Sequence, residues 1–123
     1  MSGRADFPNL GSLEAKIMRV AWEHAGVYVS VREMLERLDD DLAYTTVMTV
    51  MNRLYEKGLL LRRREGRAWS YRPATSREAY AAATMAEALD SATDRKAALL
   101  HFFADLGEDD AAALRRLLEG RPR

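Results

Sequence analysis

The stretch that most limits how this chain can fold is AYTTVMTVMNRLYEKG, residues 43–58. Its bulky apolar side chains, Val47, Val50, Met51 and Leu54, recur at spacings of three and four residues, which predicts a helix with one buried face. Exposed helix faces usually carry interleaved Glu and Lys, whereas this one carries hydroxyls, an amide and a guanidinium. Threonine is a middling helix former, so its clustering costs helix stability and indicates a function for that face. The side chains of the exposed face are Thr45, Thr46, Thr49, Asn52 and Arg53.

Two further helices are expected before this stretch. Residues 12–24 show an apolar stripe at helical spacing. Ser30 and Glu33 then form an S-x-x-E capping box, in which each side chain accepts a free backbone N–H at the start of a helix. Gly58 is the expected end of the third helix, because glycine readily adopts the left-handed conformation that follows many helices.

A β-hairpin is expected directly after the third helix. Two runs of β-type residues, 59–64 and 67–72, flank Glu65-Gly66, which is predicted to be a two-residue turn. In that register Arg62 would lie opposite Trp69. The aromatic side chains of the second run are expected to pack in the core rather than stack on bases.

Three short helices followed by a hairpin form the plan of a winged helix-turn-helix domain, which we expect at residues 1–74. Residues 75–123 indicate more short helices, with Thr75 and Glu78 as a second capping box and Asp94 as another cap. The expected fold class is therefore mainly α with a small β-hairpin: a winged helix-turn-helix DNA-binding domain plus a C-terminal helical dimerisation domain.

The expected C-terminal helices carry bulky apolar side chains around much of their circumference. Three short helices do not easily bury such side chains by themselves, whereas a second copy of the same segment would cover them, so a two-fold homodimer is expected. The alternative is a monomer in which these helices fold back on the winged domain. The expected dimerisation residues are Tyr80, Met85, Leu89, Leu99, Phe102, Phe103, Leu106, Leu114, Leu117 and Leu118.

Charge is unevenly distributed along a chain that is neutral as a whole, with 19 basic and 19 acidic residues. Residues 42–72 hold seven Lys or Arg against two acidic residues, and the chain from residue 74 onward holds seven against nine. A local basic stripe on a balanced protein is a typical electrostatic footprint for DNA. The alternative is a charged surface that is only solvated.

The exposed face of the third helix suits the major groove of DNA. A threonine hydroxyl can bond a phosphate or a base edge, its methyl can contact the thymine methyl, and arginine can reach guanine or a phosphate. Arginines around the hairpin tip can contact the phosphate backbone. The alternative is a neutral exposed face without a ligand. The expected DNA-binding residues are Thr45, Thr46, Thr49, Asn52, Arg53, Lys57, Arg62, Arg64 and Arg67.

Catalysis, cofactors and metal binding are not indicated. His24 and His101 are the only imidazoles and lie in separate regions, and the absence of cysteine excludes thiol chemistry. Consecutive carboxylates at residues 39–41 are expected to be a solvated loop. No apolar run reaches the length of about 18 residues that a transmembrane helix needs, and the N-terminus lacks a secretory core, so a cytoplasmic protein without membrane insertion is expected.

Three segments together resemble the penicillinase repressor (BlaI/MecI) family of bacterial transcription repressors: LGSLEAKIMRVAW, LAYTTVMTVMNRLYEKGLL and GRAWSYRP. The resemblance covers about residues 10–118. It implies a homodimer that binds a palindromic DNA operator and blocks transcription. It places Thr45, Thr46, Thr49 and Arg53 on the recognition helix, and Arg67 in the wing. The copper-sensing branch of the family uses C-terminal cysteines, which this chain lacks.

In the better-known members, a membrane sensor protease is activated by β-lactam and cuts the repressor within its dimerisation helices. The matching bond here is His101–Phe102, in LLHFFADL. The alternative is that Phe102 and Phe103 only form the core of the interface. Two other functions stay open: a ligand-responsive winged-helix regulator, and a winged-helix protein-interaction module that does not bind DNA.

Overall fold

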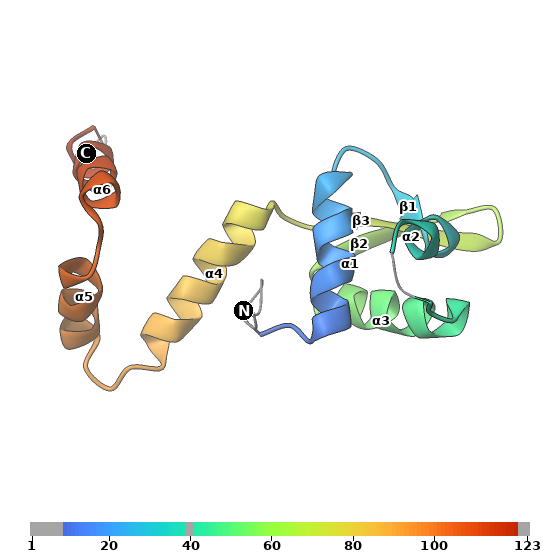
Figure 1. The fold of residues 1–123 in the computed structure, drawn as a ribbon, viewed down its shortest axis with the longest axis horizontal. Helices are drawn as coiled ribbons and strands as arrows, with labels where there is room; N and C mark the ends of the chain where they lie inside the picture. The colour runs from blue at the N-terminus through green and yellow to red at the C-terminus, as the bar shows by residue number, and fades with distance from the viewer. Residues whose placement is uncertain (1–8, 39–40, 121–123) are drawn as a thin grey trace. The chain divides into compact units, whose positions relative to one another are not determined.

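The computed structural model describes residues 9–38 and 41–120, so Asp39 and Asp40 of the expected acidic loop lie outside the described residues. Contacts within the chain divide it into two compact units, one ending at Thr84 and the other beginning at Met85. The fold is mainly helical with a small antiparallel sheet, which confirms the predicted fold class. The elements (Figure 1) are α1 (Ser12–Glu23), β1 (Val29–Ser30), α2 (Val31–Arg37), α3 (Tyr44–Glu56), β2 (Leu60–Glu65), β3 (Ala68–Pro73), α4 (Arg77–Asp90), α5 (Arg95–Ala104) and α6 (Glu108–Glu119).

The first three helices begin and end where local chemistry predicts. At α2, the Glu33 N–H donates to Ser30 Oγ at 3.1 Å and the Ser30 N–H donates to Glu33 Oε1 at 2.9 Å, so the predicted capping box is confirmed. The residue before α1 is Gly11, which has no side chain, and its N–H donates to Glu14 Oε1 at 3.0 Å. Gly58 follows α3 with a φ of 85°, a conformation that glycine adopts at little cost.

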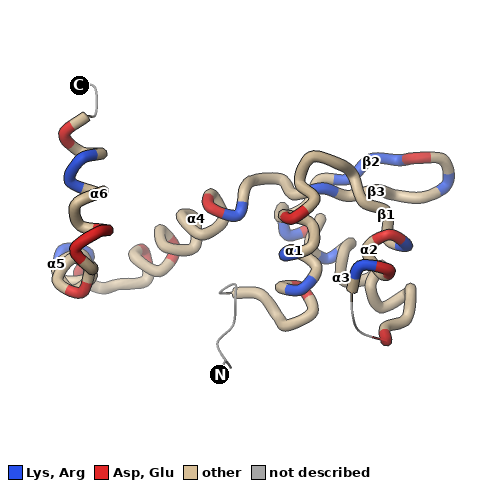
Figure 2. Tube along the Cα trace, turned by 45° about the horizontal axis from the view of Figure 1, so that its top comes forward, with Lys and Arg blue, Asp and Glu red and all other residues tan. Residues whose placement is uncertain are grey.

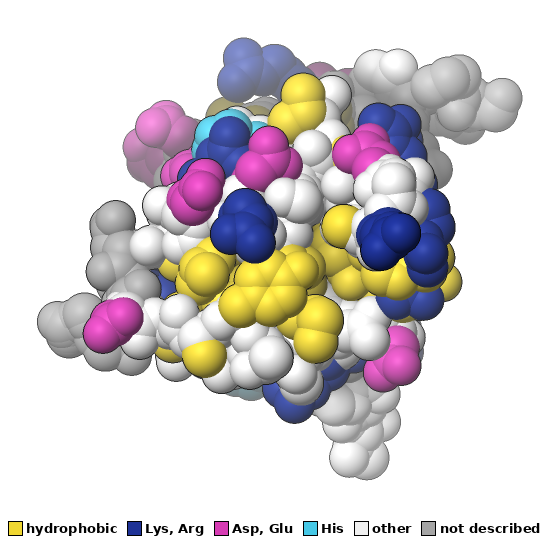
Figure 3. Space-filling view, turned by 90° about the vertical axis from the view of Figure 1, so that its right-hand side faces the viewer, with side chains coloured by type: hydrophobic (Ala, Val, Ile, Leu, Met, Phe, Trp, Pro, Cys, Tyr) yellow, Lys and Arg dark blue, Asp and Glu magenta, His cyan; other side chains and the backbone are white. Residues whose placement is uncertain are grey.

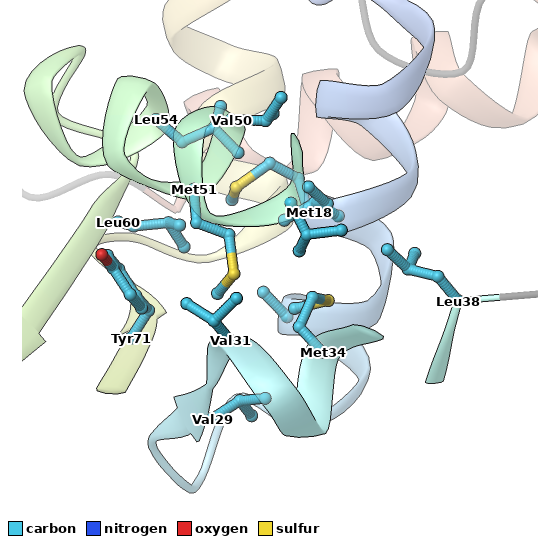
Figure 4. Packing of buried hydrophobic residues seen from close by; sticks show 13 residues of the cluster. Met18, Val29, Val31, Met34, Leu38, Val50, Met51, Leu54, Leu60 and Tyr71 are labelled. Atoms are coloured by element: carbon cyan, nitrogen blue, oxygen red, sulfur yellow. The ribbon is translucent and has the colours of Figure 1, made fainter. Parts of the chain in front are cut away.

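The core of the first unit takes one apolar face from each helix and strand between α1 and β3 (Figure 4). Val47, Val50, Met51 and Leu54 of α3 are all buried, as their spacing predicts. Such close packing of large side chains from several elements supplies most of the stability of a small domain. The largest fully buried side chains are Ile17, Met18, Val29, Met34, Val47, Met51, Leu54 and Leu60.

The sheet has three strands in the order β1-β3-β2 rather than the two that the sequence predicts. The added strand, β1, pairs antiparallel with β3 through Val29 opposite Tyr71 and Ser30 opposite Ser70. A strand of two residues is too short to show an alternating pattern, so periodicity alone predicts only a break in the helical pattern there.

The predicted register of the hairpin is wrong, because the two-residue loop begins one residue later than predicted. Glu65 pairs with Ala68, so the loop is Gly66-Arg67 rather than Glu65-Gly66, and Arg64 instead of Arg62 lies opposite Trp69. The φ of Gly66 is 66°, which suits the first central position of a type II′ turn, where glycine is preferred. The conformational need of the glycine therefore fixes the register.

The three C-terminal helices form at the predicted places with one difference at a cap. Asp94 caps α5 by accepting the Ala97 N–H at 3.0 Å, as predicted. The predicted capping box of Thr75 and Glu78 is wrong, because Ser76 Oγ instead accepts the Ala79 N–H at 3.0 Å. The division into compact units falls within α4, and the functional boundary after residue 74 stays a prediction. None of the described residues in α4, α5 and α6 is buried.

Candidate nucleic-acid interface

The exposed side of α3 carries the predicted polar ridge. Thr45, Thr46, Thr49 and Arg53 are all exposed, and Asn52 beside them is half-buried. They lie on the helix opposite the four buried residues of its apolar stripe, because side chains three and four positions apart share one face. The structure therefore brings the predicted helix residues together on one surface.

Arginines line both faces of the hairpin, as strand alternation predicts. Figure 2 shows basic residues along β2 and at the hairpin tip. The guanidinium carbon of Arg64 lies 5.1 Å from the centre of the Trp69 ring, while Arg63 on the other face lies 4.0 Å from the Tyr28 ring. Arg67 is exposed in the loop. Figure 3 shows several Lys and Arg side chains close together next to hydrophobic surface.

A cavity of about 490 Å³ lies between α3 and the sheet. Within it, Arg62 Nη1 donates to Asn52 Oδ1 at 2.6 Å. The Arg62 guanidinium carbon also lies 4.0 Å from the centre of the Tyr55 ring and 4.1 Å from that of Trp69. Two predicted DNA contacts, Asn52 and Arg62, thus bind each other. The residues lining the cavity are Met48, Thr49, Asn52, Arg53, Glu56, Arg62, Trp69 and Tyr71.

Lys57, another predicted DNA contact, forms an ion pair within the protein. Its Nζ donates to Glu14 Oε2 at 3.0 Å and to Glu14 Oε1 at 3.2 Å. Burial by itself raises the pKa of Glu14, but the Gly11 N–H, the Lys57 ammonium and the nearby Arg53 charge together hold that pKa below its ordinary value. The pair ties the start of α1 to the end of α3.

Sequence reasoning missed Glu14, which is only 7% exposed. A signal for it exists, because Leu10, Glu14, Ile17 and Ala21 are spaced by four, three and four residues. A carboxylate in the middle of an apolar stripe needs a hydrogen-bonding or charged partner when it is buried. The stripe therefore predicts a partner, although it does not say which cation supplies it.

Glu65 organises the tip of the hairpin. Arg63 Nε donates to Glu65 Oε2 at 2.7 Å, and Ser70 Oγ donates to Glu65 Oε1 at 3.0 Å. The hydrogen bond from Arg63, followed by that from Ser70, lowers the pKa of Glu65. One of the arginines of the tip is therefore held by an acid of the same strand.

The second unit exposes much of its apolar surface. Met85, Phe102, Phe103 and Leu117 keep 57%, 46%, 47% and 70% of their surface exposed. A cavity of about 400 Å³ lies between α4 and α5 and is lined by apolar side chains. Tyr80 differs from the other predicted dimerisation residues, because it belongs to the first unit, where its ring lies 5.7 Å from that of Trp22. The lining residues are Met85, Ala86, Ala88, Leu89, Ala98, Leu99 and Phe102.

In the described part of the chain, no helix is long and apolar enough to cross a membrane. Within residues 9–38 and 41–120, no group of three or more His, Asp or Glu side chains is placed to hold a metal ion.

A three-helix body, a sheet that projects a hairpin, and a polar ridge beside arginines define a winged-helix protein of the DNA-binding class. The family model described as "Penicillinase repressor" matches residues 10–120. The chain therefore belongs to the penicillinase repressor family.

Individual relatives agree with this assignment. The transcriptional regulator BlaI of Mycobacterium tuberculosis is 44% identical over 119 residues, which cover 93% of this chain and 86% of that protein. The penicillinase repressor of Bacillus licheniformis is 29% identical over 68 residues, which cover 54% of this chain and 52% of that protein. The solution structure of the DNA-binding domain of the repressor BlaI matches with a TM-score of 0.50 at 26% identity, covering 60% of this chain and 90% of that domain.

Membership of the family confirms the predicted class of protein, a DNA-binding transcriptional repressor that is not an enzyme. DNA is therefore a partner of this chain. The residues that contact DNA, the homodimer and the membrane sensor protease stay predictions.

Proposed function

We propose that this repressor acts as a homodimer that places one α3 helix in each of two major-groove half-sites of a palindromic operator. The observation that carries the proposal is the uncharged ridge of Thr45, Thr46 and Thr49 on the exposed side of α3, followed by Arg53. Short hydroxyl side chains let a helix approach base edges closely, and arginine at the end of the ridge can bond guanine or a phosphate. The two half-sites would lie about one or two helical turns apart.

The hairpin supplies the phosphate contacts in this proposal. Arg64 and Arg67 are exposed on β2 and in the loop, where a protruding strand pair can reach the DNA backbone. Lys57 belongs to the same set, because an ammonium has three donors and its pair with Glu14 leaves the side chain 42% exposed. Asn52 and Arg62 contribute to the interface through the bond that they make with each other.

The helices α4, α5 and α6 supply the dimer contacts in this proposal. None of their described side chains is buried within one chain, and the hollow between α4 and α5 is lined by apolar residues. Contiguous exposed apolar surface of this kind marks interaction sites in soluble proteins. A two-fold partner that presents the same helices covers the surface of both chains at once.

We propose that the repressor is induced to release DNA when a membrane sensor protease cuts it. The candidate bond is His101–Phe102. This bond lies inside α5, and proteases bind extended backbone, so cleavage requires α5 to open locally. Because α5 buries none of its side chains within the chain, opening it costs little in a free protomer and more in a dimer. We also infer a cytoplasmic location, because a repressor must reach chromosomal DNA.

Selection of bound fragments from genomic DNA, followed by affinity measurements on the selected sequence and on random duplex, tests the proposal. If the dimer neutralises about eight phosphates, the logarithm of the association constant falls against the logarithm of salt concentration with a slope of about −7. The operator is expected to be palindromic and to bind one dimer. Equal affinity for all sequences at low salt would refute sequence-specific binding and would favour a protein-interaction role.

A further inference from the structure

Arg62 is held on three sides where β2 faces α3. Its Nη1 donates to Asn52 Oδ1 at 2.6 Å. Its guanidinium carbon lies 4.0 Å from the centre of the Tyr55 ring and 4.1 Å from that of Trp69. The side chain is half-buried, unlike the exposed Arg64 and Arg67 nearer the hairpin tip. Arg62 is thus packed between α3 and β3 rather than extended freely into solvent.

These contacts connect two parts of the interface. Asn52 and Tyr55 belong to α3, whereas Trp69 belongs to β3, so the guanidinium of Arg62 joins the helix to the hairpin. The two elements already meet where the Leu59 N–H donates to Leu54 C=O at 2.9 Å. A second attachment nearer the tip fixes the angle between them. A planar cation between two rings with a short hydrogen bond is a rigid connection, because both stacking and hydrogen bonding constrain its plane.

The angle matters because the helix and the hairpin have to contact one duplex at the same time. Phosphate contacts set the position and orientation of a protein on DNA, and base contacts then read the sequence. If the hairpin swings away from α3, its arginines still bind phosphates somewhere, but α3 no longer meets the correct base edges. Nonspecific binding then survives while sequence preference falls.

We propose that Arg62 is a positioning residue that determines specificity by holding the wing at a fixed angle to α3, and that it contacts neither bases nor phosphates. Asn52, Tyr55 and Trp69 are the other members of this connection. The proposal rests on the proposed function, since it assumes that α3 reads bases while the hairpin binds the backbone. It differs from the prediction from sequence, in which Arg62 is itself a DNA contact.

The test compares Arg62→Lys and Arg62→Ala with wild type on the selected operator and on random duplex over a range of salt concentrations. Lysine keeps the positive charge but lacks the planar fork, so it cannot restore the connection. Both variants are expected to lose about tenfold or more in operator affinity, to keep random-duplex affinity within about twofold, and to keep the wild-type salt slope. The circular dichroism spectrum and the Tm of each variant, compared with those of wild type, show whether the variant is folded.

Arg67→Ala is the matched control, because Arg67 is an exposed arginine in the same hairpin. Its loss is expected to weaken both duplexes equally and to lower the salt slope by about one for each protomer. Trp69→Leu provides a second route: it should reduce operator preference as Arg62→Ala does, and the double variant should lose little more than either single variant.

The results distinguish a failure of the positioning role of Arg62 from a failure of the proposed function. If Arg62→Lys behaves as wild type while Arg62→Ala weakens both duplexes equally and lowers the salt slope, Arg62 is a phosphate contact and the positioning role is wrong. If wild type itself prefers no sequence, the proposed function fails before the role of Arg62 is reached. Additive losses in the double variant would also overturn the connection between Arg62 and Trp69.

Discussion

Replacing Glu14 with alanine tests how the helices that carry the interface are held together. The Glu14 carboxylate accepts the Gly11 N–H at the start of α1 and two hydrogen bonds from Lys57 at the end of α3. Gly11 has no side chain that could take over as a cap. Glu14→Ala therefore removes both the cap of α1 and the partner of Lys57.

The expected loss of stability follows from these two contacts. Removal of a side-chain cap costs about 1 kcal/mol. The ion pair adds up to about 1 kcal/mol, because Lys57 is 42% exposed and can turn into solvent when its partner is gone. A total of about 2 kcal/mol lowers the Tm of a domain of this size by about 8–16 °C.

The loss also depends on pH with a defined sign. Because the pKa of Glu14 is lowered in the folded state, its contribution is complete above the ordinary value of 4.5 and disappears as the pH falls through the folded-state pKa. The difference in stability between wild type and Glu14→Ala should therefore be largest at neutral pH. It should shrink as the solution is acidified below pH 4.5.

Thermal unfolding at fixed protein concentration and several pH values measures the effect, since a dimer makes the Tm depend on concentration. Glu33→Ala is the matched control: Glu33 is an exposed capping residue of α2, where Ser30 Oγ still accepts the Glu33 N–H at 3.1 Å after the change. It should cost about 1 kcal/mol or less. Equal losses in the two variants, or a Glu14→Ala loss that does not change with pH, would refute the assigned role of Glu14.

Three other substitutions test separate parts of the structure. Gly66→Val should cost about 1–2 kcal/mol in chemical denaturation, because a β-branched residue is strained at the φ of 66° that the hairpin turn requires; an unchanged midpoint would contradict the observed turn. Arg53→Ala should cost about 1–3 kcal/mol in operator binding and relax base preference at one position, whereas a lower salt slope with equal weakening on every sequence would make Arg53 a phosphate contact. Phe102→Glu should weaken self-association about tenfold or more in sedimentation experiments while half-site binding by the winged unit persists, and an unchanged dimer would exclude Phe102 from the interface.

The helices of the first unit were predictable because their signals are local. The stripe of α3 and the capping box of Ser30 and Glu33 each lie within a few turns of helix, and the structure confirms both. The strand β1 was not predictable in this way, since Val29 and Ser30 form a strand only by pairing with residues of β3 that lie far along the chain. The register of the hairpin has a different cause: it depends on the φ of Gly66 in the turn, which the spacing of the two β-type runs does not show.

The candidate interface was predictable as a set of exposed positions, but the partners of its side chains were not. Periodicity places Thr45, Thr46 and Thr49 on the outside of α3 without reference to any other element. It cannot show that Arg62 bonds Asn52, because that contact depends on the angle between a helix and a hairpin. Basic residues that look equivalent in the sequence therefore divide into exposed ones and ones held within the protein.

For the helices α4, α5 and α6, neither the sequence nor the fold of one chain shows what covers their exposed apolar side chains. The buried cluster of the winged unit and the apolar residues packed on it all come from the part of the chain between Leu10 and Tyr71. That core is closed by its own elements, so it does not require the apolar side chains of α5 and α6. Phe102 and Phe103 remain about half exposed, their rings 5.7 Å apart. Aromatic surface of this kind is costly to leave in water, and in the homodimer that we propose a second copy of the chain would bring an identical surface to cover it.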